Sequence, residues 1–221
     1  MTDLSPHIDS WHATQRIESW AGEVRVNMIR MIGIALFYGR HFFDVMLNPG
    51  AVDQAYHHRV TAVAVIWAVA AMALHWLLVR RRYCPPTLHY ATIAFDAFMI
   101  ALLCTIAGGP RTPLMLLFFP LIAMAPLRLS LPVVYASTVA AAGGYLIVVA
   151  YYAWYEIGIE RYYSTPHLRI PRSEQAIYVL AMIVTGLLAG QMVRQARRIA
   201  RGPHLQIAAE PSTTAPAEQE G

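Results

Sequence analysis

The sequence predicts an all-α membrane protein, a bundle of six transmembrane helices with both termini in the cytoplasm. Hydrophobic residues make up 57% of its 221 residues, charged residues only 14%, and the mean hydropathy is +0.43. This composition is typical of a polytopic membrane protein. A helix needs about 20 mostly apolar residues to cross the hydrocarbon layer, and long apolar runs lie at 26–46, 60–78, 87–108, 114–127, 132–155 and 175–193.

The arginines indicate how these runs are oriented. They cluster at alternate connections, chiefly at residues 80–82, at Arg128 and at residues 194–201. The positive-inside rule assigns such connections to the cytoplasm, so both termini are expected there. The net charge of +4 therefore reflects topology, and the bilayer rather than a nucleic acid is the expected partner.

The chain divides into three parts. Residues 1–25 are expected to form an amphipathic lead-in, with Trp20 on its apolar face. This lead-in either lies in the membrane interface or packs on the bundle from the cytoplasmic side. Residues 26–201 form the membrane domain. Residues 202–221 are expected to be a disordered tail, because Gly202 and Pro203 should end the last helix and the remainder, rich in Ala, Pro, Thr and Glu, lacks a foldable core.

Asp96 is the sharpest single feature, because it lies about 15 Å inside the third run, near the bilayer centre. A carboxylate at that depth must face the bundle and find a partner or a proton. Arg40, His41 and Tyr38 of the first run are the expected neighbours, although Arg40 has Asp44 one turn away as an alternative partner. The resulting cluster is either a functional site or a structural hydrogen bond between helices.

Two glycine patterns each have a structural and a functional interpretation. Gly186 and Gly190 form a small-xxx-small pattern that serves either internal packing or a homodimer contact. The stretch from Gly108 and Gly109 through Arg111, Thr112 and Pro113 predicts a short rigid turn. We interpret this turn as either an ordinary connection or the border of a signal-binding surface at the outer interface.

Other chemistry is not expected. The histidines His41, His75 and His89 fall at scattered depths without ligand spacing, which predicts neither a metal nor a haem site. Phosphate-binding, nucleophile-elbow and zinc-protease motifs do not occur in the sequence. The sequence therefore does not predict an enzyme.

One long stretch of the chain resembles a known family. Asp96 is followed by Gly108-Gly109-Pro110-Arg111-Thr112-Pro113-Leu114 and later by Pro126-Leu127-Arg128-Leu129-Ser130. This pattern, spread over roughly residues 20–200, is similar to the six-helix membrane sensor region of bacterial histidine kinases. Redox-responsive members use a Gly-Gly-x-x-Asn-Pro-Phe stretch to sense quinone. Here Thr112 replaces the Asn and Leu114 the Phe.

The resemblance implies a multi-pass protein of the bacterial cytoplasmic membrane that senses a membrane-borne or redox-type signal, with quinone as a conceivable ligand. Kinases of this family continue from the last helix into phosphoacceptor and ATP-binding domains, which do not follow here. We therefore expect a stand-alone sensor that signals to a separate protein. The alternatives are a small transporter or channel that uses Asp96, and a structural subunit of a membrane complex.

Overall fold

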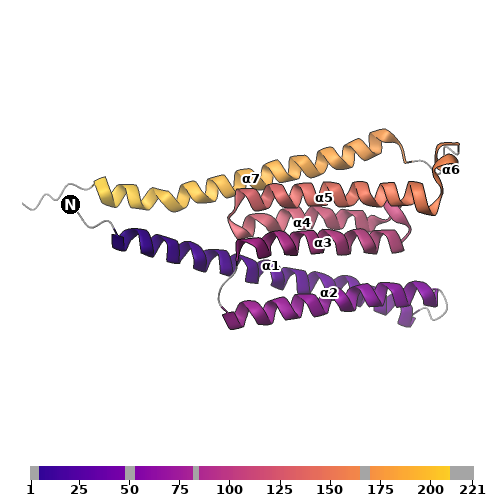
Figure 1. Ribbon diagram of the computed structural model, residues 1–221, viewed down its shortest axis with the longest axis horizontal. Helices are drawn as coiled ribbons and strands as arrows, with labels where there is room; N and C mark the ends of the chain where they lie inside the picture. Colours follow the sequence, from indigo (N-terminus) through magenta and orange to yellow (C-terminus); the bar gives the residue numbers. More distant parts are fainter. Residues whose placement is uncertain (1–4, 48–52, 82–84, 165–169, 210–221) are drawn as a thin grey trace, which may run out of the picture.

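The computed structural model describes residues 5–47, 53–81, 85–164 and 170–209, which are helical apart from short turns. In chain order the elements are α1 (Ser5–Leu47), α2 (Gln54–Arg81), α3 (Pro86–Ile106), η1 (Gly109–Arg111), η2 (Pro113–Leu117), α4 (Phe118–Met124), η3 (Ala125–Arg128), α5 (Leu131–Tyr151), the π-helical turn η4 (Tyr152–Glu156), α6 (Ile159–Ser164) and α7 (Arg172–Ala209). Apart from the short α6, the α-helices run along one common axis (Figure 1).

Four helical segments within the described ranges are long and apolar enough to cross a membrane: Gln54–Arg81, Thr87–Ile106, Leu131–Glu156 and Arg172–Ile199. They agree with four of the predicted runs. The run in α1 does not qualify because it carries Asn27, Arg30 and other polar residues. The remaining run corresponds to Pro113–Arg128, which is apolar but short.

The two end helices are longer than expected. α1 joins the expected lead-in and first run in one unbroken helix, so the lead-in does not turn aside to lie along the membrane surface. α7 continues through Gly202 and Pro203 to Ala209, contrary to the expected helix end at those residues. A proline inside a helix removes one hydrogen bond and crowds the carbonyl four residues earlier, and α7 nevertheless continues past Pro203. Of the expected tail, residues 210–221 lie outside the described ranges.

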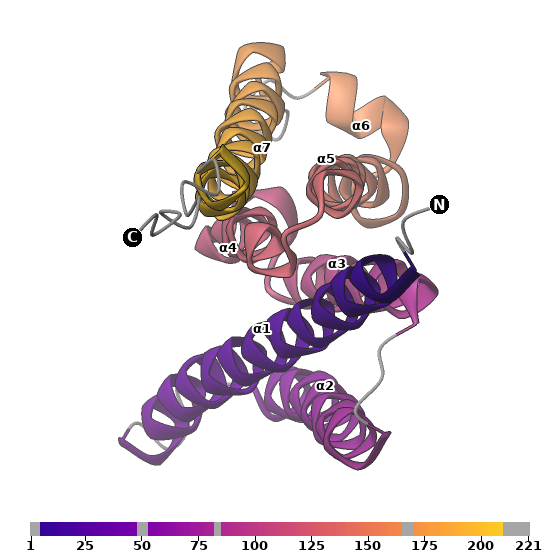
Figure 2. The ribbon, with the colours of Figure 1, turned by 90° about the vertical axis from the view of Figure 1, so that its left-hand side faces the viewer.

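α1 and α7 extend beyond the other helices at the same end of the molecule (Figure 1). We call this the projecting end. The opposite end, which carries η1, is the turn end. Viewed along the axis, α1 crosses the bundle obliquely and leaves α3 as it proceeds toward α2 (Figure 2).

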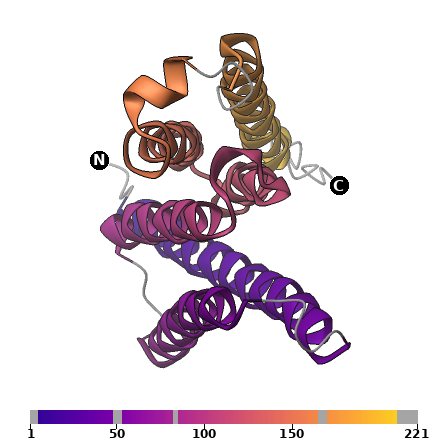
Figure 3. The same cartoon turned by 90° about the vertical axis from the view of Figure 1, so that its right-hand side faces the viewer.

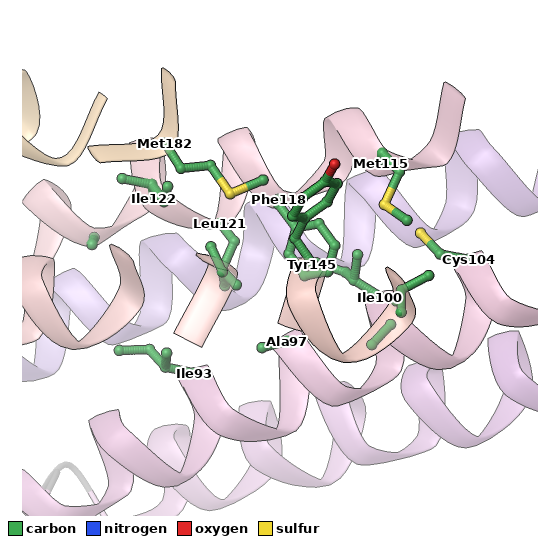
Figure 4. Packing of buried hydrophobic residues seen from close by; sticks show 14 of the residues in the cluster. Ile93, Ala97, Ile100, Cys104, Met115, Phe118, Leu121, Ile122, Tyr145 and Met182 are labelled. Carbon is green, nitrogen blue, oxygen red and sulfur yellow. The ribbon is translucent and has the colours of Figure 1, made fainter. Parts of the chain in front are cut away.

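The apolar core lies among α3, α4, α5 and α7 rather than around α1. Phe118 of α4 is fully buried beside Tyr145 of α5, with Ile100 and Cys104 of α3 and Met182 of α7 around them (Figure 4). Such burial and close packing dominate the stability of a core. By contrast, the buried side chains of α1 include Glu23, Asn27 and Arg30. Polar contacts must therefore hold α1 to the rest of the molecule.

The segment 113–128 is short because it is not one regular helix. Prolines interrupt it, and it alternates between 3₁₀ geometry in η2 and η3 and a seven-residue α4. It ends at Leu129, a non-glycine residue in the left-handed conformation with φ 50° and ψ 32°. This conformation costs about 1–2 kcal/mol for an L-residue, so the surrounding contacts must enforce it.

Candidate functional site

Arg30 of α1 and Asp96 of α3 form a buried ion pair. Arg30 donates from Nε and Nη2 to Oδ2 of Asp96 over 3.0 and 2.6 Å, while Trp67 of α2 donates from Nε1 to Oδ1 over 3.0 Å. Arg30 also donates from Nη1 to Oδ1 of Asn27 over 2.7 Å. The two charged side chains are only 5% and 4% exposed. Each neutralises the other in a place where an unpaired charge would be costly.

Glu23 is the centre of a second buried cluster, two turns nearer the start of α1. Arg128 of η3 binds it in a bidentate manner, from Nε to Oε2 over 2.6 Å and from Nη2 to Oε1 over 2.9 Å. His89 Nδ1 lies 2.7 Å from the same Oε2, and Thr92 Oγ1 lies 3.3 Å from Oε1. Arg128 Nη2 also donates to Thr92 over 3.2 Å. Bidentate arginine–carboxylate contacts are among the strongest polar contacts in proteins.

Glu23 is fully buried and lies level with the start of the membrane-spanning part of α3, because its partners His89 and Thr92 belong to the span Thr87–Ile106. The bidentate contact with Arg128 gives its carboxylate a counter-ion and holds α1 on η3.

The two clusters place α1 and α3 in one parallel register. Glu23 and His89 are 66 residues apart in the chain, and so are Arg30 and Asp96. Because two residues seven apart lie on nearly the same face of a helix, each helix presents a polar stripe to the other. We call this interface the α1–α3 stripe.

A second face of α1 contacts α2 in antiparallel register. Four contacts define it: Trp20 Nε1 to the Leu78 carbonyl (2.8 Å), Asn27 Nδ2 to the Ala71 carbonyl (3.0 Å), the Tyr38 hydroxyl to Thr61 Oγ1 (3.3 Å) and His41 Nε2 with His57 Nδ1 (3.1 Å). The chain separation falls from 58 residues at Trp20 to 16 at His41, as expected for a helical hairpin. α1 and α2 are therefore fastened along most of their shared length.

At the projecting end, α1 approaches η3 very closely. A Cβ added at Gly22 would lie 2.5 Å from the carbonyl oxygen of Leu127, inside any permitted contact distance. Toward the turn end, α1 lies away from α4 (Figure 3). Because Gly22 has no side chain, α1 can contact η3 at this point. From there toward the turn end, α1 and α4 diverge.

A groove opens on this diverging side of α1. Its main cavity, of about 480 Å³, is lined by α1, α2, the end of α3 and η2. A smaller apolar cavity of about 120 Å³ continues from it toward Arg30, Asp96 and Met124. The two share the lining residues Ile34, Phe37, Trp67, Leu103 and Leu117. We call the two together the lateral groove, because Phe37 and Leu116 on its rim are 51% and 57% exposed.

Asp96 faces α1, but the neighbours expected from the sequence are not its partners. Arg40 lies 3.7 Å from Asp44, the alternative pairing, and both side chains are exposed. His41 and Tyr38 contact α2. Arg30 and Arg40 are about 15 Å apart along α1, so the expected neighbours lie too far toward the turn end. They line the mouth of the lateral groove, while Asp96 lies at its inner end.

The predicted signal-binding turn is divided between two roles. Thr112 and Pro113 line the groove mouth together with Tyr38 and Arg40. Thr112 also caps η2 by accepting a hydrogen bond from the Leu114 amide at 3.4 Å. Gly108, Gly109 and Arg111 are not among the residues that line the groove.

Gly108 and Gly109 have structural reasons to be glycine. Their φ values are 99° and 77°, a region that favours glycine. A Cβ at Gly109 would lie 2.6 Å from the Tyr152 ring. Arg111 is exposed and is not one of the residues that line the groove.

Gly186 and Gly190 pack within the chain. The space beside Gly186 is filled by Thr138 of α5, and the nearest side chains to Gly190 are those of Leu131 and Tyr135. Of the two roles that the sequence left open, internal packing agrees with this arrangement.

Residues 128 and 129 connect the two projecting helices. The Arg128 side chain binds Glu23 of α1, and the neighbouring Leu129 carbonyl accepts hydrogen bonds from Nε and Nη2 of Arg197 on α7, over 3.1 and 2.6 Å. Arg194 of α7 donates to the Tyr135 hydroxyl nearby over 3.1 Å. We call this the 128–129 junction. Any displacement of η3 acts on both helices that leave the bundle.

Sequence reasoning missed Glu23, Arg30, His89 and Arg128 as site residues. A signal for them existed, because polar residues recur seven apart at Glu23 and Arg30 and again at His89 and Asp96. In a membrane bundle such a stripe indicates a buried face rather than a solvated one. Arg128 was instead assigned to topology, and Arg30 was given no role.

Within the described ranges, no group of three His, Cys, Asp or Glu side chains lies close enough to hold a metal ion. The site consists of ion pairs, hydrogen bonds and an apolar groove. Comparison with family models, with curated proteins and with solved structures finds no match to this chain.

Proposed function

We propose that this chain is a sensor-like integral membrane protein that detects a membrane-borne signal in the lateral groove and passes it to a separate signalling protein at the projecting end. In this proposal α1, α2, α3, the segment 113–128, α5 and α7 cross the bacterial cytoplasmic membrane. The projecting end, with both termini, is cytoplasmic.

The charge distribution supports this orientation. The projecting end carries Arg80 and Arg81 in the last turn of α2, and Arg194, Arg197 and Arg198 in the second half of α7. The turn end mixes its arginines with acids such as Asp53 and Glu160. The positive-inside rule favours the first end for the cytoplasm.

The observation that carries the proposal is the α1–α3 stripe, which extends from the inner end of the groove to the 128–129 junction. Trp67, which lines the groove, donates to Asp96, and Asp96 binds Arg30. Two turns away on the same face of α1, Glu23 binds Arg128. Two turns of α1 and of α3 join the two polar clusters, so a change at the groove that moves α1 relative to α3 acts on both clusters and reaches both projecting helices.

The state of Asp96 favours a sensor over a transporter. A transported proton or cation needs a carboxylate that can release its present partners. Both oxygens of Asp96 are engaged, one by Arg30 and one by Trp67. Displacing a buried, hydrogen-bonded cation is costly, which favours a structural and coupling role.

Site-specific photocrosslinking tests the output. A photoreactive residue at Arg198, exposed on α7, should capture a cytoplasmic protein in cells that naturally express the chain. The same residue at the exposed Val139 of α5, which we expect to face lipid, is the control. Glu23→Gln should change the yield at Arg198 by weakening the 128–129 junction. Proton or cation flux in proteoliposomes that is lost in Asp96→Asn would instead establish the transporter.

A further inference from the structure

The lateral groove has a polar mouth and an apolar inner end. The mouth gathers Tyr38, Arg40, His41, Tyr56 and Thr112 near the turn end. The inner cavity is lined almost wholly by carbon, including Gly33, Pro120 and Leu121. This division matches an amphipathic occupant with its head at the membrane interface and its tail toward the bilayer centre.

The groove suits one hydrocarbon chain. A cavity of about 480 Å³ is within the usual range for a single small ligand. His41 at the mouth and Arg30 at the inner end are about 16 Å apart along α1, roughly half the hydrocarbon thickness. The exposed rim formed by Phe37 and Leu116 allows entry from the lipid.

The mouth offers hydrogen-bond donors. Arg40 contacts Asp44 at 3.7 Å, too far for a hydrogen bond, and the two side chains are 83% and 55% exposed. Such a pair contributes little, so the guanidinium donors remain available to a head group. Among the described residues that line the mouth, Asp44 is the only acid.

His41 also lines the mouth, and its Nε2 lies 3.1 Å from His57 Nδ1. Because the guanidinium of Arg40 carries a positive charge, an anionic oxygen fits this end better than a neutral group.

We infer that the lateral groove binds a single-chain lipid with a carboxylate head, of the fatty-acid type, its head at Arg40 and His41 and its tail passing Trp67 toward Gly33. The inference rests on the proposed function, because it names the ligand class of the same groove.

Binding is tested with the full chain in lipid nanodiscs and a fatty acid that carries a nitroxide in mid-chain. Electron paramagnetic resonance measures the immobilised fraction. We expect saturable immobilisation that the unlabelled acid displaces, whereas its methyl ester displaces it about tenfold less well, because the ester cannot accept a charge-assisted hydrogen bond from Arg40. Arg40→Gln should weaken binding of the acid and leave binding of the ester unchanged.

Two glycines of α1 provide a matched control. Neither Gly33 nor Gly39 has a neighbour within 4 Å of an added Cβ, but only Gly33 lines the groove. Gly33→Leu should fill the inner cavity and abolish immobilisation, whereas Gly39→Leu should not. Equal displacement by acid and ester would refute the carboxylate head while leaving the groove as a ligand site. Immobilisation that does not saturate, and that Gly33→Leu leaves unchanged, would refute both the inference and the groove's proposed sensing role.

Discussion

Arg30 donates both Nε and Nη2 to a single oxygen of Asp96, Oδ2, and leaves the other oxygen to Trp67. The carboxylate therefore holds three helices together, since Arg30 belongs to α1, Trp67 to α2 and Asp96 to α3. The α1–α2 hairpin shares little of the apolar core, so this carboxylate is its main attachment at mid-bundle.

Removing one member of the pair should be worse than removing both. Asp96→Asn leaves the buried Arg30 charge without a counter-ion, which costs on the order of 3 kcal/mol. Arg30→Gln leaves Asp96 similarly uncompensated. The double variant should regain part of the loss. Unfolding in a denaturing detergent, analysed as a double-mutant cycle, measures the coupling. Additive losses would show that the two side chains act independently.

Glu23→Gln should weaken the attachment of α1, because it leaves the buried guanidinium of Arg128 without its counter-ion, which costs on the order of 3 kcal/mol. Thermal unfolding of the purified variant measures the loss. An unchanged melting temperature would mean that the contact between Glu23 and Arg128 contributes nothing to stability.

Gly22→Ala should destabilise the protein by about 1–3 kcal/mol, the usual cost of overpacking. The new methyl group would lie 2.5 Å from the Leu127 carbonyl oxygen, and backbone would have to move. Gly39→Ala is the matched control, because it lies on the same helix in open space, and it should be neutral or stabilising. Thermal unfolding of the two purified variants decides between these expectations.

Leu129 should respond to substitution according to backbone conformation rather than size. Its φ of 50° is unfavourable for leucine and worse for a β-branched residue. We expect Leu129→Gly to raise the melting temperature and Leu129→Val to lower it. Arg197→Gln, which removes two hydrogen bonds to the Leu129 carbonyl, should reduce the gain from glycine if α7 enforces this conformation.

The proposed topology is tested by reporter fusions. Fusions after Arg82 and Arg201 should report a cytoplasmic location, and a fusion after Tyr163 an external one, because basic connections remain inside. A fusion at Arg201 that reports an external location would contradict the orientation and move the output to the other side of the membrane.

Much of the fold could be predicted because hydropathy acts locally. The ends of α2 and α3 follow from the apolar runs and from prolines at their boundaries, and α1 ends at Leu47, immediately before Asn48-Pro49-Gly50. The continuation of α7 to Ala209 could not be predicted from Gly202 and Pro203. A local helix-breaking preference is one contribution among many along a long helix.

The candidate site was less predictable because pairing depends on rotation and depth together. Depth alone placed Arg40 within reach of Asp96, but depth along two tilted helices is known only to within a turn or two. Arg30 is the partner of Asp96 because it lies on the same face of α1 as Glu23. Glu23 and Arg30 are two turns apart on α1, and their partners His89 and Asp96 are two turns apart on α3. The pairing could have been predicted from the equal spacing of the polar residues on the two helices, but not from the depth of Asp96 alone.

The close contact at Gly22 is a pivot point for α1. From Gly22 the helix extends about 28 Å to His41 in one direction and about 26 Å to Ser5 in the other. A tilt that widens the lateral groove at its mouth must therefore swing the start of the helix by a similar distance in the opposite direction. The movement is inverted rather than amplified, and it reaches the end of α1 that lies farthest from the groove.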